Sequence, residues 1–198
     1  IVISGFSGVG KGTVVKRLVS DYGYSLSISA TTRAPREGEV DGREYYFKSK
    51  EEFKNLIDYN GFIEWAVYVE NYYGTPRAFV EKELAAGHNV ILEIEVQGAM
   101  NIKEQYPDAV LIFLTAPNAE ELKQRLIGRG TEEASVVEKR MKRAMEESED
   151  MNQYEYIVIN DDLDQCVKDV NSVIVAKGCM IENNIEYVNQ MKAELKAL

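Results

Sequence analysis

The sequence predicts an α/β protein, in which a parallel β-sheet is flanked by helices on both faces. Runs of apolar residues alternate with amphipathic helical segments, which is the pattern of successive βαβ units. The later runs are apolar at nearly every position, as expected for strands that are covered on both faces. With 198 residues, 45% of them hydrophobic, the chain is long enough to build one three-layer domain.

The first unit consists of a short strand, a glycine-rich loop and a helix. An apolar strand is expected at residues 1–4, and a helix at 11–21, where Val14, Val15, Leu18 and Val19 share one face. The same criteria place the other core elements in order along the chain. We expect strands at 89–94, 109–114 and 156–159, and helices at 96–105, 118–126 and 161–177.

Two segments interrupt this alternation. Residues 30–80 are rich in Tyr, Phe, Arg and Gly and contain short strand-like pieces around a helix at 50–59, which predicts a small inserted α+β lobe. Residues 125–150 carry alternating charges on a helical pattern with little apolar face, which indicates an exposed, mobile lid. Within it, the acidic run 146–150 is expected to be a solvated helix face. Residues 179–198 contain no motif and are expected to form a terminal helix.

The charge balance limits the classes of partner. The formal net charge is −10, from 33 acidic and 23 basic residues, so a general affinity for nucleic acid or membrane surfaces is not expected. An anionic ligand must therefore be bound by local groups of arginine, lysine and backbone N–H.

Cysteine and histidine usage excludes several kinds of site. Cys166 and Cys179 have neither metal-ligand spacing nor a disulfide framework, so we expect reduced thiols in a cytoplasmic protein. The single histidine, His88, is expected in a solvent-facing loop, which disfavours a Ser-His-Asp triad. The longest apolar run, 109–114, is too short to span a bilayer, and a signal peptide is not expected. Since the chain starts without methionine inside a strand, further residues are expected upstream.

The loop GFSGVGKGT at residues 5–13 fits the phosphate-binding pattern G-x-x-x-x-G-K-[ST] at every position except the last. Such glycines allow backbone N–H groups to converge on an anion at a helix N-terminus, and Lys11 adds a charge for the β- and γ-phosphates. The alternative is an ordinary glycine-rich turn, but the strand before and the helix after favour phosphate binding. Gly12 stands where the pattern has the hydroxyl that ligates Mg²⁺. Whether Thr13 contacts Mg²⁺, its water shell or a phosphate oxygen is left open.

A second candidate anion site lies in TTRAPREGEVDGREYYF. Arg33 and Arg36 flank Pro35 and are followed by Tyr45, and two guanidinium groups with a phenol hydroxyl suit a phosphate. The alternative is a basic surface turn. A second anion site is favoured because the chain also contains a phosphate-binding loop.

The third candidate is Glu64 in the segment GFIEWA. A carboxylate accepts two hydrogen bonds from the N1–H and N2–H₂ groups of guanine, whereas adenine has no donor at N1. The alternative is a solvent-facing carboxylate on a strand, because the neighbours Ile63 and Trp65 are apolar.

The chain resembles guanylate kinase in an ordered set of motifs that covers residues 1–177. The motifs are GxSGxGKG, SxSxTTRxPRxGExxGxxY, FxEWA, NYYGT, a strand followed by QG, GRGT and VINDDL. The resemblance implies a P-loop NTPase-type core and Mg²⁺-dependent transfer of the γ-phosphoryl group of ATP to GMP, and to dGMP, in purine nucleotide metabolism. It also implies a monomer or homodimer without nucleic-acid or membrane partners.

The sequence disfavours three other functions. A kinase for AMP, UMP or CMP is disfavoured by Glu64 with Thr75 and by the TTRAPR run. A catalytically inactive scaffold module is disfavoured by the intact phosphate-binding loop, and a GTPase by the absence of an N-K-x-D motif.

The resemblance divides the chain into an ATP-binding core (1–29, 81–117 and 151–198), a GMP-binding lobe (30–80) and a lid (118–150). It assigns ATP binding to the loop residues Gly5, Phe6, Ser7, Gly8, Val9, Gly10, Lys11, Gly12 and Thr13, with Arg125 and Asn160 near the adenine. It assigns the GMP phosphate to Arg33, Arg36, Tyr45 and Tyr73, and guanine to Ser29, Glu64 and Thr75, the two hydroxyls towards O6. The transferred group is assigned to Lys11, Arg33, Arg129 and Arg140.

Some of these assignments have open alternatives. Arg129 and Arg140 are otherwise surface helix charges, and Asn160 is otherwise the N-cap of the following helix. Many guanylate kinases have Asp-Ile-Asp where this chain has Glu93-Ile94-Glu95, so each side chain is one methylene longer here. The resemblance implies a contact of Glu95 with GMP and leaves open whether Glu93 contacts the Mg²⁺ shell. No residue is assigned as a direct metal ligand.

Overall fold

A parallel five-stranded sheet forms the centre of the part of the chain that the computed structural model describes, residues 1–68, 70–128 and 134–198. Its strand order is β2-β7-β1-β8-β9, with bounds β1 Val2–Gly5, β2 Ser25–Ser27, β7 Val90–Glu93, β8 Leu111–Thr115 and β9 Tyr156–Ile159. The central strand β1 pairs with β7 on one side and β8 on the other, so that Val2 lies opposite both Leu92 and Leu111.

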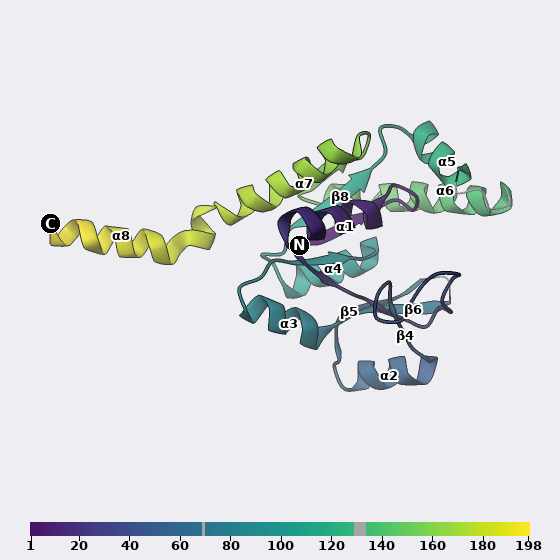
Figure 1. Cartoon of the computed structure of the whole chain (residues 1–198), viewed down its shortest axis with the longest axis horizontal. Coiled ribbons are helices and arrows are strands. Elements are labelled where there is room, and N and C mark those ends of the chain that lie inside the picture. Colours follow the sequence, from purple (N-terminus) through teal and green to yellow (C-terminus); the bar gives the residue numbers. More distant parts are fainter. Residues whose placement is uncertain (69, 129–133) are drawn as a thin grey trace.

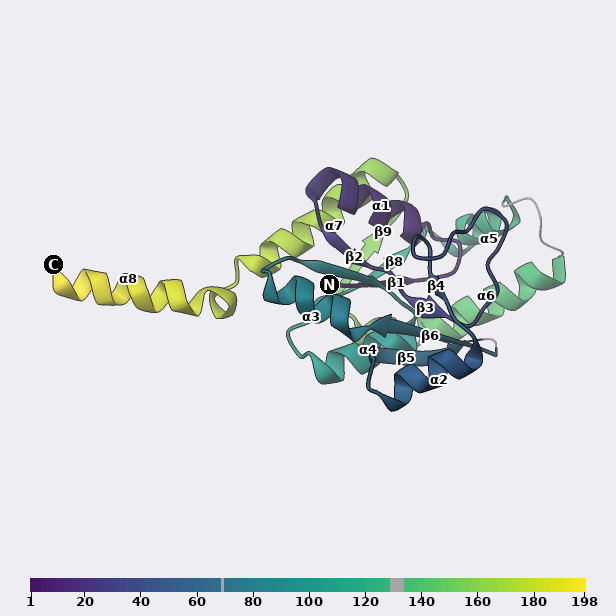
Figure 2. The same ribbon diagram turned by 60° about the horizontal axis from the view of Figure 1, so that its bottom comes forward.

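Helices cover both faces of this sheet (Figure 2). One face carries α1 (Lys11–Tyr22) and α7 (Leu163–Gly178), and the other carries α3 (Arg77–Ala85) and α4 (Val96–Gln105). A separate cluster of buried apolar side chains packs between the sheet and the helices on each face. Leu18 of α1 belongs to one cluster and Ile102 of α4 to the other. The amphipathic pattern of the helices therefore fixes the three-layer core.

A second sheet, of order β4-β3-β6-β5, lies beside the first within the described residues. It consists of β3 (Ala30–Thr31), β4 (Tyr46–Phe47), β5 (Phe62–Tyr68) and β6 (Asn71–Pro76). Helix α2 (Lys50–Asp58) covers it through Phe53, whose ring stacks on Phe62 at a centroid distance of 4.4 Å. Ser49 and Glu52 form a capping box that starts α2 after the extended chain.

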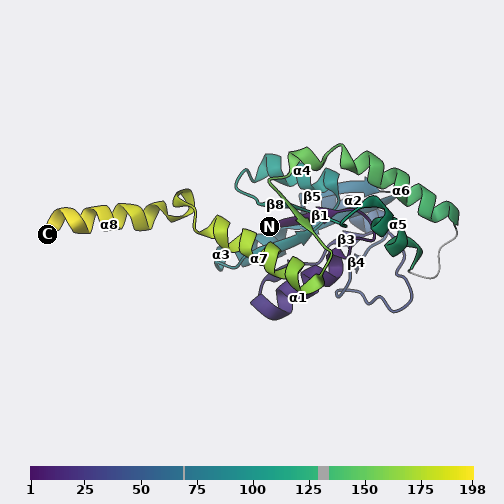
Figure 3. The ribbon, with the colours of Figure 1, turned by 90° about the horizontal axis from the view of Figure 1, so that it is seen from above.

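Two helices, α5 (Ala119–Ile127) and α6 (Ala134–Ser148), lie at one end of the molecule, and η1 (Met151–Gln153) leads back to the sheet (Figure 3). Asn118 caps α5 by accepting a hydrogen bond from the Glu121 N–H at 2.8 Å. The expectation that the acidic run 146–150 is a solvated face is wrong for Glu147, which is only 4% exposed. Its side chain is covered because it forms an ion pair with Arg143 on the same helix.

The C-terminal segment projects away from the rest of the molecule (Figure 1). After α7, a short 3-10 turn η2 (Ile181–Asn184) leads into α8 (Ile185–Ala197), in which no residue is buried. The terminal helix expected here is thus present as α8, and it starts only at Ile185, after η2.

The predicted core strands and helices are confirmed, with ends that differ by one or two residues. Strand β2 was not predicted because its sequence SLS is short and polar, and α3 was not predicted because it directly follows a strand. The proposed N-cap role of Asn160 is wrong, since the Asp162 side chain caps α7 by accepting from the Gln165 N–H at 2.8 Å. Both cysteines are free, and no helix among the described residues is long and apolar enough to cross a membrane.

Candidate active site

One cleft of about 800 Å³ is bounded by the loop between β1 and α1, the second sheet and α6. Most of the predicted site residues lie along it, namely Ser7, Gly8, Gly10, Lys11, Gly12, Ser29, Arg33, Arg36, Tyr45, Glu64, Tyr73, Glu95 and Arg140. Other predicted residues lie behind or beside its walls, namely Gly5, Phe6, Val9, Thr13, Thr75, Arg125 and Asn160. Arg129 falls outside the described residues.

The glycine-rich loop wraps around the N-terminus of α1. Gly8 and Gly10 have φ angles of 89° and 96°, in the left-handed region that favours glycine, and a Cβ atom on Gly10 would lie 2.8 Å from the Asn160 amide nitrogen. Because Gly10 has no side chain, no side-chain oxygen at the N-cap accepts a hydrogen bond from the first N–H groups of α1. These N–H groups can therefore bind an anionic ligand. Lys11 Nζ donates to the carbonyl oxygens of Gly5 at 2.7 Å and Phe6 at 3.2 Å, so its ammonium group is held over the loop.

The position after Lys11 faces the half-buried carboxylate of Glu93. A Cβ atom on Gly12 would lie 3.7 Å from Glu93 Oε2, whereas the neighbouring Thr13 is exposed. Burial raises the pKa of Glu93, and the charge of Lys11 opposes that shift. The described residues contain no group of three His, Cys, Asp or Glu side chains that is suited to hold a metal ion.

Asn160 and Arg125 support the loop through hydrogen bonds and do not line the cleft themselves. Asn160 Nδ2 donates to the Val9 carbonyl at 2.8 Å, and Arg125 Nη1 donates to the Asn160 carbonyl at 2.7 Å. Arg125 also forms an ion pair with Glu121 at 2.8 Å. These bonds connect the end of β9 and helix α5 to the phosphate-binding loop.

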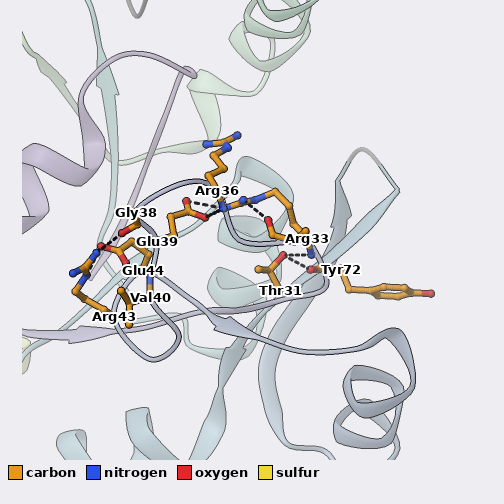
Figure 4. Close-up of polar contacts among 10 residues, drawn as sticks. Thr31, Arg33, Arg36, Gly38, Glu39, Val40, Arg43, Glu44 and Tyr72 are labelled. Carbon is orange, nitrogen blue, oxygen red and sulfur yellow. Dashed lines mark hydrogen bonds and ion pairs between the residues drawn. The ribbon is translucent and has the colours of Figure 1, made fainter. Parts of the chain in front are cut away.

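The Glu39 carboxylate binds the Arg33 guanidinium (Figure 4). Glu39 belongs to the segment TTRAPREGE, but its motif predicted no role for it. Arg33 Nη2 donates to both carboxylate oxygens of Glu39, at 2.9 and 3.0 Å, and the Arg36 N–H donates to Glu39 Oε2 at 2.7 Å. Burial acts to raise the pKa of Glu39, but these hydrogen bonds outweigh it and hold the pKa below its ordinary value. The Arg36 side chain is exposed and lines the cleft, free of this carboxylate.

Two tyrosines stand beside Arg33. The rings of Tyr45 and Tyr73 meet edge to face at a centroid distance of 6.0 Å, and the Arg33 guanidinium lies 5.4 Å from the centre of the Tyr45 ring. Burial raises the pKa of Tyr45 to about 12, so its phenol stays protonated and is a hydrogen-bond donor at neutral pH.

Glu64 lies on β5 opposite Thr75 of β6 and is 6% exposed, which excludes the solvent-facing alternative. The Thr75 hydroxyl donates to Glu64 Oε1 at 2.6 Å. On the other side, a Cβ atom on Gly98 of α4 would lie 2.6 Å from Oε2, so only glycine leaves room for the carboxylate there. Burial raises the pKa of Glu64 to about 7. The carboxylate is therefore fixed in position and close to half ionised at neutral pH.

Helix α6 contributes more basic side chains than the sequence analysis named. Besides Arg140, the cleft is lined by Lys139, Lys142 and Arg143. Arg143 Nε donates to the buried Glu147 at 3.0 Å, and burial together with the charge of Glu95 raises the pKa of Glu147. The spacing of basic residues along 139–143 was the signal that could have identified them, because i, i+3 and i, i+4 positions share a helix face.

Comparisons with known proteins agree on one family. A family model described as guanylate kinase matches residues 1–177. Guanylate kinase from Lactiplantibacillus plantarum is 52% identical over 199 aligned residues, which cover 100% of this chain and 97% of the relative. That of Caldanaerobacter subterraneus is 48% identical, covering 98% of this chain and 95% of the relative. The crystal structure of guanylate kinase from Anaplasma phagocytophilum superposes with a TM-score of 0.76 and 31% identity, covering 90% of this chain and 85% of that one.

Proposed function

The chain belongs to the guanylate kinase family, and on that premise we propose that its cleft transfers the γ-phosphoryl group of ATP to GMP, giving ADP and GDP. The observation that carries this proposal is the placement of Glu64 in the same cleft as Lys11. The phosphate-binding loop accounts for the donor nucleotide. The buried carboxylate of Glu64, which no cationic side chain among the described residues pairs with, suits the two donors of guanine.

For ATP, we assign the phosphates to the loop residues and Lys11. Ser7, Gly8 and Gly10 line the cleft, whereas Phe6 and Val9 are buried in the core and anchor the loop to the sheet. We assign Arg125 and Asn160 to the adenine of ATP. Asn160 donates a hydrogen bond to the loop at Val9, and Arg125 donates to the Asn160 carbonyl, so both lie next to the loop.

For GMP, we assign the phosphate to Arg33, Arg36, Tyr45 and Tyr73, with Glu39 positioning Arg33. Guanine is assigned to Glu64, with Ser29 on the same cleft wall. Thr75 is assigned a positioning role instead of a contact with O6, because its hydroxyl proton is already donated to Glu64. Glu95 and Arg140 line the same cleft, and we assign them to GMP and to the transferred group respectively.

The chemical step requires positioning and charge stabilisation more than proton transfer. The second pKa of a phosphate monoester is about 6, so the GMP phosphate is largely a dianion at neutral pH and needs no general base. The difficulty is that two polyanions must approach each other while charge spreads over the transferred group. Lys11, the loop N–H groups, Arg33 and the basic side chains of α6 stabilise that charge.

We propose Mg²⁺ as the cofactor. Glu93 fits this role because its carboxylate lines the cleft beside Gly12 of the loop and Mg²⁺ prefers oxygen ligands, so it would help to hold the ion. When bound, Mg²⁺ supplies neutralisation of the phosphate charge.

The division into a core, a GMP-binding lobe at 30–80 and a lid at 118–150 is part of the proposal. Closure of the lid over both nucleotides would exclude water, which otherwise competes with GMP for the phosphoryl group. We propose a cytoplasmic enzyme, in keeping with its two free cysteines.

The experiment that tests the function is ADP production from ATP with GMP as acceptor, run beside dGMP, AMP, UMP and CMP. We expect turnover with GMP and dGMP and at least a hundredfold lower kcat/KM with the other acceptors. A preference for AMP or a pyrimidine nucleotide would contradict the proposal. Calorimetric titration with ATP separates the enzyme from a scaffold module, which would bind no ATP.

A further inference from the structure

Strand β5 contains a β-bulge directly before Glu64. Phe62 lies opposite Pro76 of β6. Two residues further along β5, Glu64 lies opposite Thr75, which is only one residue away from Pro76. Ile63 is therefore an extra residue in β5. Successive side chains of a regular strand alternate between its two faces, so an extra residue changes the face on which the following side chains lie.

The bulge lets β5 contribute to the core of the second sheet and to the cleft within three residues. The Phe62 ring stacks on Phe53 of α2. The Glu64 carboxylate points the other way, beside Gly98 of α4, and lines the cleft. In a regular strand Phe62 and Glu64, at positions i and i+2, would share one face. Ile63 between them is buried in the core of the main sheet. The bulge therefore directs Glu64 into the cleft.

The Arg77 side chain, at the start of α3, binds the chain immediately before this bulge. Its Nη2 donates to the Phe62 carbonyl at 2.8 Å and to Asn60 Oδ1 at 3.1 Å. Its Nε donates to the Asn60 carbonyl at 2.9 Å, and the Arg77 N–H donates to the Gly61 carbonyl at 2.9 Å. Pro76, opposite Phe62, has no N–H to donate across the strands. The guanidinium thus supplies a donor that the neighbouring strand lacks at this point.

An ion pair on the surface of α3 does not account for these contacts. Arg77 Nη1 lies 3.3 Å from Glu81 Oε1, one helical turn away, and the Glu81 side chain is 56% exposed. Exposed pairs of this kind contribute little to stability. The shorter hydrogen bonds of Arg77 all go to residues 60–62, so the guanidinium is placed to fix the bulge.

We propose that Arg77 is a positioning residue for GMP recognition, which fixes the bulge at Ile63 and thereby holds the Glu64 carboxylate in place for guanine. Arg77 does not line the cleft, so it acts through Glu64 and not by contact with a nucleotide. The role rests on the proposed function, because it takes guanine as the ligand of Glu64. Strand β5 lies between α2 and α4, and Arg77 connects its first residues to α3 (Figure 2).

Steady-state kinetics of matched variants tests this role. Arg77→Met removes the donors and keeps an unbranched side chain. It should raise the KM for GMP about tenfold, because a displaced carboxylate loses one of its two hydrogen bonds to guanine, and it should leave the KM for ATP unchanged. The change in kcat should be less than about twofold. Glu81→Gln removes only the ion pair on α3 and should leave the GMP kinetics unchanged.

A double-mutant cycle separates an effect through Glu64 from a general loss of structure. In a Glu64→Gln background, Arg77→Met should change the KM for GMP less than about twofold, because the group that Arg77 positions is already altered. A general structural role would give the same factor in both backgrounds. If Arg77→Met does not fold, Arg77→Lys serves in the same comparisons, since lysine has one nitrogen in place of the guanidinium fork.

Trp65 reports on the bulge without any nucleotide. It is the single tryptophan of the chain, directly follows Glu64 and is 41% exposed. Its fluorescence emission and its quenching by acrylamide should differ from wild type in Arg77→Met and match wild type in Glu81→Gln. A wild type that does not phosphorylate GMP would contradict the proposed function, and the Trp65 comparison would still decide the role of Arg77. An unchanged Trp65 signal, an unchanged KM for GMP or equal factors in the two backgrounds would overturn that role.

Discussion

Glu64 should make GMP recognition depend on pH across the neutral range. Burial raises the pKa of Glu64 to about 7, and only its ionised form accepts both hydrogen bonds from guanine. Lowering the pH from 8 to 6 reduces the ionised fraction from about ten-elevenths to about one-eleventh. The KM for GMP should therefore rise about tenfold over these two units. Titration of the GMP phosphate near pH ~6 adds about a further factor of two.

In the ligand-free protein, the neutral form of the Glu64 carboxyl should favour folding, whereas GMP binding requires its ionised form. Its folded pKa lies above the ordinary 4.5, so the neutral form is favoured in the folded state, and stability is lost as pH rises from 4.5 to about 7. A shift of this size corresponds to about 3 kcal/mol. Glu64→Gln removes the buried charge and keeps the shape, so it should be more stable than wild type at pH 8 by up to that amount. The difference should be much smaller at pH 5.

The assay is steady-state kinetics with saturating ATP from pH 6 to 8, for wild type and Glu64→Gln, with GMP and AMP as acceptors. Glu64→Gln should show a higher KM for GMP at pH 8, only the small pH trend of the phosphate, and a weaker preference for GMP over AMP. Thermal unfolding without nucleotides supplies the stability comparison. Equal pH trends of KM in the two proteins, or an unchanged GMP:AMP preference, would refute the role given to Glu64.

Three further predictions concern the loop and the second sheet. Lys11→Ala should lower kcat by about 10²–10³-fold, because a charge that stabilises the transferred group is lost; near-normal turnover in a rapid-quench assay would contradict the assignment. Gly98→Ala should raise the KM for GMP at least tenfold and leave the KM for ATP unchanged, since the new methyl group would overlap the Glu64 carboxylate; unchanged GMP kinetics would show that the carboxylate shifts freely. Glu39→Gln should raise the KM for GMP about tenfold through loss of a charged hydrogen-bond partner of Arg33, with a smaller change in kcat. GMP titration calorimetry checks this last prediction, and an unaltered dissociation constant would refute it.

Elements with a strong repeating pattern were predictable from the sequence. The continuous apolar runs at β7, β8 and β9 and the one-sided pattern of α1 leave few alternatives, because burial on one or both faces dictates the spacing of apolar residues. Strand β2 could not be predicted, since the polar residues of SLS become a core strand only when β7 is available to pair with them. Its existence depends on a partner more than 60 residues away in sequence.

The sequence predicted many residues of the candidate site but few of the contacts between them. The motifs identified Glu64 and Arg33, but neither the role of Gly98 nor that of Glu39 could be derived from them. Gly98 matters because α4 approaches β5 in space, and Glu39 matters because the chain turns back on Arg33. The burial of Glu147 was missed because charged residues in a run usually face solvent, and the ion pair with Arg143 overrides that tendency.

The central position of β1 has a consequence for biosynthesis. The strand that carries the phosphate-binding loop leaves the ribosome before β8, one of its two neighbours in the sheet, where Leu111 pairs with Val2. At synthesis rates of about 5–20 residues per second, the loop waits roughly 5–20 s before that side of its strand is paired. During this time Val2 and Ile3, both fully buried in the finished protein, have no complete sheet to join. The strand that leads into the nucleotide-binding loop is thus translated well before its side of the sheet can be completed.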